Sequence, residues 1–165
     1  MSFARSVLPL LLAATAGMVA VAGCGQVQHH QSVGGLDVAL PWARAVPPGA
    51  PVAAGYLTIR NRGTHQDRLV SVRTSSAERV EIHAMRMEDG VARMRALADG
   101  LPIPPGATVS VAPGGYHLMF ITPGTAFTAG GEAQVTLVFA EAGELQVVFE
   151  VRPMGDIAAP AGAHH

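Results

Sequence analysis

Short apolar runs broken by turn residues fill the chain from Leu36 onward, and this feature constrains the fold most. The runs are rich in Val, Ile, Leu, Phe and Thr, and Gly, Pro, Asp and Asn separate them. No segment shows the clear apolar period of an amphipathic helix. The pattern predicts an all-β domain, either a Greek-key β-sandwich or a barrel. The expected strands cover residues 36–41, 52–60, 67–75, 79–87, 91–97, 107–111, 115–121, 133–140 and 144–151.

The first 23 residues have the character of a secretory signal. Arg5 supplies a weakly positive start, and residues 7–21 are apolar but too short for a convincing membrane span. The segment ends in VAGC, residues 21–24, which resembles the lipobox of bacterial lipoproteins. We therefore expect lipidation of Cys24 and a lipid anchor on the extracytoplasmic face of the bacterial cell envelope. The alternative is an ordinary signal peptide followed by a cysteine by chance.

The remainder of the chain divides into three parts. Residues 24–35 are polar and contain glycine, as expected of a flexible tether. Residues 36–152 hold the expected strands and form the domain, and residues 153–165 are rich in Ala, Gly and Pro and are expected to be disordered. Because Cys24 is the only cysteine, the domain has no internal disulfide and depends on its apolar core.

Charge and known motifs argue against several classes of function. Lys and Arg total 11 and Asp and Glu total 12 without a basic stripe, which argues against nucleic acid as a partner. The chain has no G-x-S-x-G, no H-E-x-x-H and no phosphate-binding glycine loop, which argues against an enzyme. A blue-copper electron carrier needs a cysteine thiolate in its site, and Cys24 lies at the predicted lipid attachment instead.

A predicted hairpin over residues 83–96 gathers a histidine and methionines on one face. A two-residue turn at Asp89–Gly90, a favoured hairpin type, places Met85 opposite Met94. His83 then shares their face and lies diagonal to Met94. A three-residue loop would turn Met94 onto the opposite face, which carries Arg86, Arg93 and Arg95.

The segment PGGYHLMFITPG, residues 113–124, repeats this combination of side chains. In a strand, Tyr116, Leu118 and Phe120 share the core face, whereas His117 and Met119 share the other. Thioether sulfur and neutral imidazole together favour Cu(I) over Zn²⁺, Ca²⁺ or Mg²⁺. The alternative is ordinary packing, because methionine is a routine core residue and a single histidine in a strand is usually hydrogen-bonded or exposed.

The spacing of these residues resembles a known family motif. Ten residues separate His83 from Met94, and twenty-two separate Met94 from His117-x-Met119. This pattern resembles the H-x10-M-x21-H-x-M motif of the PCuAC-type periplasmic copper chaperones, with the second gap one residue longer. The segments 41–63, 87–95 and 113–120 also resemble family sequence. The similarity covers essentially the whole domain.

This resemblance implies a cupredoxin-like β-sandwich that binds one Cu(I) ion through His83, Met94, His117 and Met119, with Met85 as a possible alternate ligand. It implies a chaperone, not an enzyme, that transfers copper by ligand exchange. The implied acceptor is the CuA centre of cytochrome c oxidase, reached through an oxidase subunit or a Sco-type thiol protein. The alternatives are a copper-scavenging or storage lipoprotein and a β-sandwich interaction module without metal.

Some members of that family carry a C-terminal extension rich in His and Met that binds Cu(II). The tail of this chain has only three such residues, Met154, His164 and His165, which form a candidate second copper site. The alternative is a pair of solvated histidines.

Overall fold

The computed structural model describes residues 30–153 and residue 155, and this part of the chain is built of strands. One short 3-10 turn, η1(Thr125–Phe127), is the only helical element among the described residues, so the expected all-β class is confirmed. No helix in this part of the chain has the length and apolar character needed to cross a bilayer. The strands are β1(Gln31–Val33), β2(Leu36–Arg44), β3(Val52–Asn61), β4(Asp67–Arg73), β5(Ala77–Glu88), β6(Val91–Ala96), β7(Leu101–Ile103), β8(Thr108–Val111), β9(Tyr116–Pro123), β10(Glu132–Phe139) and β11(Gly143–Arg152).

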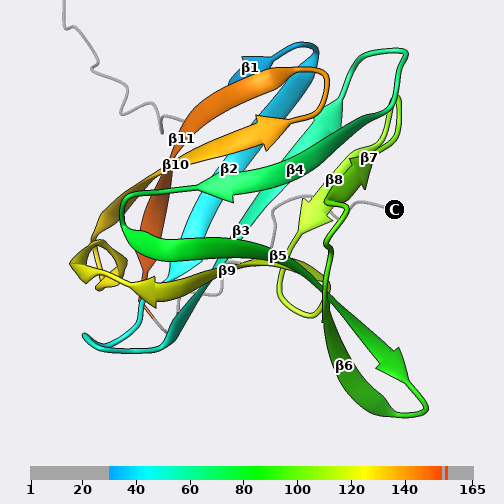
Figure 1. The fold of residues 1–165 in the computed structure, drawn as a ribbon. Coiled ribbons are helices and arrows are strands. Elements are labelled where there is room, and N and C mark those ends of the chain that lie inside the picture. The colour runs from blue at the N-terminus through cyan, green and yellow to red at the C-terminus, as the bar shows by residue number, and fades with distance from the viewer. Residues whose placement is uncertain (1–29, 154, 156–165) are drawn as a thin grey trace, which may run out of the picture.

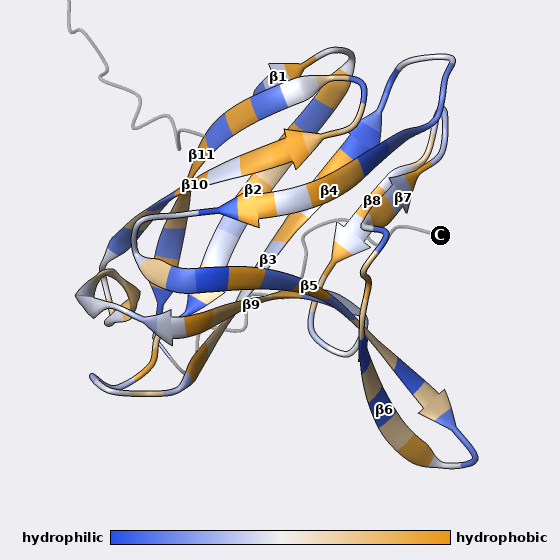
Figure 2. Ribbon diagram, in the orientation of Figure 1, coloured by the Kyte–Doolittle hydropathy of each residue, from blue (hydrophilic) through white to orange (hydrophobic). Residues whose placement is uncertain are grey.

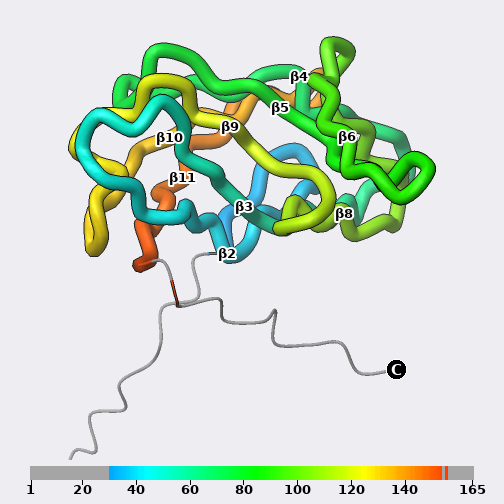
Figure 3. The backbone as a smooth tube through the Cα atoms, turned by 90° about the horizontal axis from the view of Figure 1, so that it is seen from below, coloured from blue at the N-terminus to red at the C-terminus, as the bar shows by residue number. Residues whose placement is uncertain are grey.

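The strands form one 11-stranded sheet that curls around a single interior (Figure 1, Figure 3). Its order is β6-β5-β9-β8-β3-β2-β11-β10-β4-β7, with β1 paired to β2 and an additional pairing of β9 with β3. The pairs β11–β2 and β8–β9 are parallel, and the other pairs are antiparallel. The β5–β6 hairpin projects from the body of the sheet, which leaves its far end without a further layer (Figure 1).

Alternation along the strands produces the core, visible as bands of opposite hydropathy in Figure 2. Phe120 of β9 is fully buried, with its ring centroid 4.7 Å from that of Phe127 and 5.7 Å from that of Phe149. Gly55 of β3 makes room for this cluster, because a Cβ there would lie 2.5 Å from an edge atom of the Phe120 ring. The inward face of β9 is therefore fixed by aromatic packing.

Two strands were not expected from the sequence. Residues 31–33, assigned above to the flexible tether, pair with β2 as β1, so that part of the tether expectation is wrong. Gly34 and Gly35 form the intervening turn with φ values of +53° and +85°, which glycine adopts without strain. Strand β7 has only three residues and includes a proline, so its strand pattern is weak, but Leu101 and Ile103 are both fully buried. Cys24, Met154, His164 and His165 lie outside the described residues.

A buried carboxylate holds the turn between β10 and β11. One oxygen of Asp67 accepts hydrogen bonds from the backbone N–H groups of Arg68, at 2.6 Å, and Glu141, at 3.0 Å. Its other oxygen accepts one from the N–H of Ala142 at 2.9 Å. The carboxylate therefore connects the start of β4 to a turn more than 70 residues later.

Replacing Asp67 by asparagine is expected to lower the free energy of unfolding by about 1–3 kcal/mol. An amide has one acceptor oxygen, so its NH₂ group must face at least one of these three N–H donors. Urea unfolding followed by circular dichroism measures the change. Asp99→Asn, at an exposed side chain, is the matched control and is expected to leave the stability unchanged; an Asp67→Asn protein as stable as this control would contradict the role of the carboxylate.

Candidate metal centre

Pairing of β5 with β9 brings together the two histidines predicted from separate segments. His83 and His117 are direct partners in the antiparallel register, so their side chains lie on the same face of the sheet. Leu118 and Phe120, the alternate residues of β9, are fully buried on the other face. The aromatic core thus turns His117 and Met119 away from the interior of the sandwich.

The two imidazole rings are close together and largely shielded from water. Their centroids are 5.7 Å apart and their planes are inclined by 50°. His117 is 6% exposed and the side chain of His83 is 13% exposed. A metal–imidazole bond is about 2.0 Å long, so this spacing leaves room for one ion bound by both rings.

Each ring has one nitrogen with a partner and one without. Nδ1 of His117 lies 3.1 Å from the carbonyl oxygen of Gly115, and Nε2 of His83 lies 2.9 Å from Oε2 of Glu81. The remaining nitrogens, Nδ1 of His83 and Nε2 of His117, are the buried side-chain nitrogen or oxygen atoms without a hydrogen-bond partner among the described residues. Leaving such an atom unpaired costs about 1–3 kcal/mol, and a ligand shared by the two rings would satisfy both atoms.

The β5–β6 hairpin has the register expected from the sequence. Met85 is opposite Met94, and His83 is opposite Ala96. Asp89 and Gly90 have φ values of +53° and +78°, as the two-residue primed turn requires. The opposite face of the hairpin carries Arg86, Arg93 and Arg95, the last two in ion pairs with Glu88.

The methionines differ in their register relative to the histidine pair and in their exposure. Met119 follows His117 by two residues on β9 and is half-buried. Met85 is half-buried next to His83 on β5, whereas Met94 approaches His83 along the diagonal from β6 and is 47% exposed. Met87 is 68% exposed, further along the projecting hairpin. The two imidazoles therefore form the buried part of the candidate site, and Met94 forms its exposed edge.

Glu81 is a residue of the site that was not predicted from the sequence. Its position two residues before His83 places it on the same face of β5, and its direct partner on β9 is Met119. The hydrogen bond with His83, and secondly that with Arg79, holds the pKa of the Glu81 carboxyl below its ordinary value. Strand alternation could have identified Glu81, since the same alternation places His83 and Met85 on one face.

The donors of the candidate site come from three strands, β5, β6 and β9. Within residues 30–153, no group of three or more His, Cys, Asp or Glu side chains is arranged to hold an ion. The donors that share this face are two imidazoles and thioether sulfurs, a combination that favours Cu(I).

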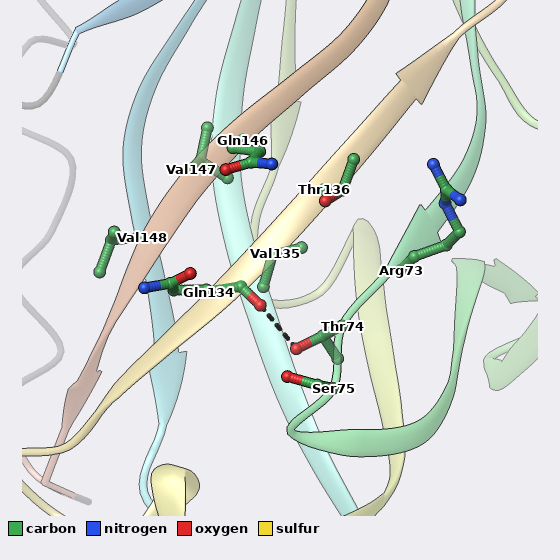
Figure 4. Close-up of a pocket in the computed structure, with 9 residues that line it drawn as sticks. All are labelled: Arg73, Thr74, Ser75, Gln134, Val135, Thr136, Gln146, Val147 and Val148. Carbon is green, nitrogen blue, oxygen red and sulfur yellow. Dashed lines mark hydrogen bonds between the residues drawn. The ribbon is translucent and has the colours of Figure 1, made fainter.

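Surface hollows elsewhere do not coincide with this site. One of about 640 Å³ lies over β4, β10 and β11, where the Thr74 hydroxyl donates to the carbonyl oxygen of Gln134 at 2.6 Å (Figure 4). Another of about 680 Å³ lies beside Asp67 and His65. Neither is lined by the four predicted copper ligands. The candidate centre lies on the face of β5 and β9 opposite the core, apart from both hollows.

The chain is similar to a family of known proteins. The family described as "Putative lipoprotein LpqE-like" matches residues 36–151. The putative lipoprotein Lxx21020 of Leifsonia xyli is 28% identical over 149 residues, which cover 90% of this chain and 88% of the relative.

Solved structures are similar over most of the domain. The copper-bound PCuAC domain from PmoF2 has a TM-score of 0.64 at 29% identity, covering 76% of this chain and 98% of that domain. The apo PCuAC domain from PmoF1 has the same TM-score at 28% identity, covering 76% and 99%. The Cu(I) form of DR1885 from Deinococcus radiodurans, at 23% identity and a TM-score of 0.57 over 75% and 80%, shares the fold. The expected cupredoxin-like Greek-key sandwich and the resemblance to PCuAC domains are confirmed.

Proposed function

Given that this chain belongs to the LpqE-like lipoprotein family and shares its fold with a copper-bound PCuAC domain, we propose that it is an extracytoplasmic Cu(I) chaperone. The copper ion is its cargo. His83, His117, Met119 and Met94 are the proposed ligands, with Met85 as an alternate that lies directly opposite Met94.

One observation carries this proposal more than any other. Two facing histidines, 5.7 Å apart between ring centroids, each present a buried nitrogen without a hydrogen-bond partner. Pairing of β5 with β9 brings them together across 34 residues of sequence. The flanking methionines provide soft sulfur on the same face, which suits Cu(I) better than a harder ion.

Release of copper follows from the uneven exposure of the ligands. Two imidazoles and two thioethers are all neutral, so the site holds the ion without cancelling its positive charge. A thiolate of an acceptor protein binds Cu(I) more strongly than a thioether and first displaces Met94, the ligand at the exposed edge. The buried histidines leave last, and no covalent bond of a substrate is made or broken.

The proposal includes a location in the cell and an acceptor for the copper. Lipidated Cys24 anchors the chain at the extracytoplasmic face of the cell envelope, and residues 24–30 connect the anchor to β1. The acceptor is a thiol-bearing or CuA-type protein of cytochrome c oxidase assembly. Met154, His164 and His165 are a proposed secondary site for Cu(II), since imidazole also binds that ion well.

Titration with Cu(I) against a competing colorimetric chelator tests the function. The protein is the chain from residue 24 onward with Cys24→Ala, because an unlipidated thiolate at that position would itself bind Cu(I). We expect one equivalent of copper bound in competition with the chelator, and nitrogen and sulfur neighbours in the X-ray absorption spectrum. Absence of competitive binding would contradict the chaperone function and favour an interaction module without metal.

Replacing methionine by leucine, which has a similar volume but no sulfur, tests the methionine ligands. Met94→Leu and Met119→Leu are each expected to weaken Cu(I) binding by about 10-fold or more, since even the loss of an outer-shell partner costs about 10–100-fold. Leucine and methionine have similar volumes, so the fold is retained. Met87→Leu, at an exposed methionine further along the same hairpin, is the control and leaves the affinity unchanged. Equal affinities in all three variants would exclude sulfur ligation by Met94 and Met119.

A further inference from the structure

We propose that Glu81 is a positioning residue that sets which nitrogen of His83 faces the metal. The inference rests on the proposed copper function, because it concerns the same site. It assigns to Glu81 a hydrogen bond to His83, and no direct bond to copper.

The hydrogen bond between these residues selects one tautomer of the His83 ring. Oε2 of Glu81 lies 2.9 Å from Nε2 of His83. An ionised carboxylate only accepts hydrogen bonds, so Nε2 must carry the proton. A neutral imidazole then has its lone pair on Nδ1, which is the buried nitrogen that has no partner in this structure. The carboxylate thus prepares Nδ1 as the donor atom.

The carboxylate is itself held in place from the other side. Nε of Arg79 donates to Oε1 of Glu81 at 2.9 Å, while Oε2 accepts from His83. Arg79, Glu81 and His83 alternate along β5 and therefore share one face of the strand. Rotation of the imidazole would break its bond to a carboxylate whose other oxygen is held by Arg79, so this bond favours one ring orientation before any metal binds.

The two histidines are prepared by different partners and in opposite tautomers. Nδ1 of His117 donates to the carbonyl oxygen of Gly115, which leaves Nε2 of that ring with its lone pair. The backbone therefore orients His117, and a side chain orients His83. Carboxylate or carbonyl partners of this kind raise the basicity of metal-binding histidines and fix their orientation.

Nitrogen-15 NMR of the histidine side chains in the metal-free protein tests the tautomers directly. The spectra are recorded in mildly alkaline buffer, at about pH 8. In the wild type we expect protonated Nε2 with unprotonated Nδ1 for His83, and the reverse for His117. In Glu81→Ala, His83 is expected to become a mixture of both tautomers, while Glu81→Gln, which retains an acceptor oxygen, keeps the wild-type tautomer.

Cu(I) affinity provides the second readout. Glu81→Ala is expected to bind Cu(I) about 10–100-fold more weakly at an unchanged stoichiometry, and Glu81→Gln is expected to restore part of the loss. Glu132→Ala removes the same charge from an exposed position of β10, which does not pair with β5 or β9, and leaves both readouts unchanged.

Failure of this inference and failure of the proposed function give different results. Protonated Nδ1 on His83 in the wild type, or wild-type tautomer and affinity in Glu81→Ala, would overturn the role of Glu81 while copper binding stands. Absence of copper binding by the wild type would overturn the function, and the metal-free spectra would still decide the tautomer that Glu81 imposes.

Discussion

Replacing His117 by alanine is expected to weaken Cu(I) binding by at least about 100-fold, the upper end of what loss of an outer-shell partner costs. His117 is the more deeply buried of the two facing histidines, and its free Nε2 has no alternative partner among the described residues. No other described histidine lies next to His83 to replace it, since its direct strand partners are His117 and Ala96. Competition with a colorimetric Cu(I) chelator measures the loss.

A variant at a distant histidine distinguishes this effect from a general one. His65 is exposed in the loop before β4, where its ring contacts the Thr64 hydroxyl, and His65→Ala is expected to retain the wild-type affinity. Wild-type copper affinity in His117→Ala would remove the facing imidazoles from the site and with them the main support for the proposed function.

Stability is expected to respond in the opposite direction at the same position. His117 contributes one hydrogen bond to a backbone carbonyl and leaves a buried nitrogen unpaired. Replacing it by leucine removes that unpaired atom, so the metal-free His117→Leu protein is expected to be as stable as the wild type or more stable. Such a result would show that His117 does not favour folding of the metal-free protein.

Replacing Phe120 by alanine is expected to lower the free energy of unfolding by about 3–5 kcal/mol. Its ring is fully buried and lies 4.7 Å from Phe127 and 5.7 Å from Phe149, so alanine would leave a cavity lined by two other aromatic rings. Gly55 is already beneath the ring and has no side chain with which to fill the space. Urea denaturation with intrinsic fluorescence and circular dichroism measures the change.

The cavity left by Phe120→Ala would lie close to the candidate metal centre. Phe120 follows Met119 on β9 and pairs with Val80 of β5, so it supports the same strand pairing that joins His83 to His117. Val70→Ala, at a residue that is 40% exposed on β4, is the control and is expected to change the stability by less than about 0.5 kcal/mol. A Phe120→Ala protein as stable as Val70→Ala would contradict the aromatic core described here.

Much of the fold could be predicted from the sequence because strand alternation is a local signal. The nine expected strands are all present, with ends shifted by a few residues. The turn at Asp89–Gly90 specified the hairpin register, since two residues with positive φ allow one tight pairing of the flanking strands. Strands β1 and β7 were missed because three residues are too few to show a period, and their stability comes from pairing with β2 and β4.

The candidate site was only partly predictable, because strand alternation gives the face of a side chain but not its contacts. Alternation placed His117 and Met119 on one face of β9, and His83, Met85 and Met94 on one face of the hairpin, from residue order alone. The same alternation also places Glu81 beside His83, but its hydrogen bond to Nε2 depends on the side-chain conformations. The role of Glu81 therefore required the structure.

The amino-acid sequence by itself determined which donor atoms are available and which face of its own strand each one occupies, because the two-residue period of a strand is set by the backbone. The tertiary structure alone decided that β5 and β9 are neighbours in the register that places His83 against His117. That choice depends on which core faces pack together: Phe120 of β9 pairs with Val80 of β5 and packs against Phe127 and Phe149. The two unpaired nitrogens of the candidate metal centre lie on neighbouring strands only because of this packing.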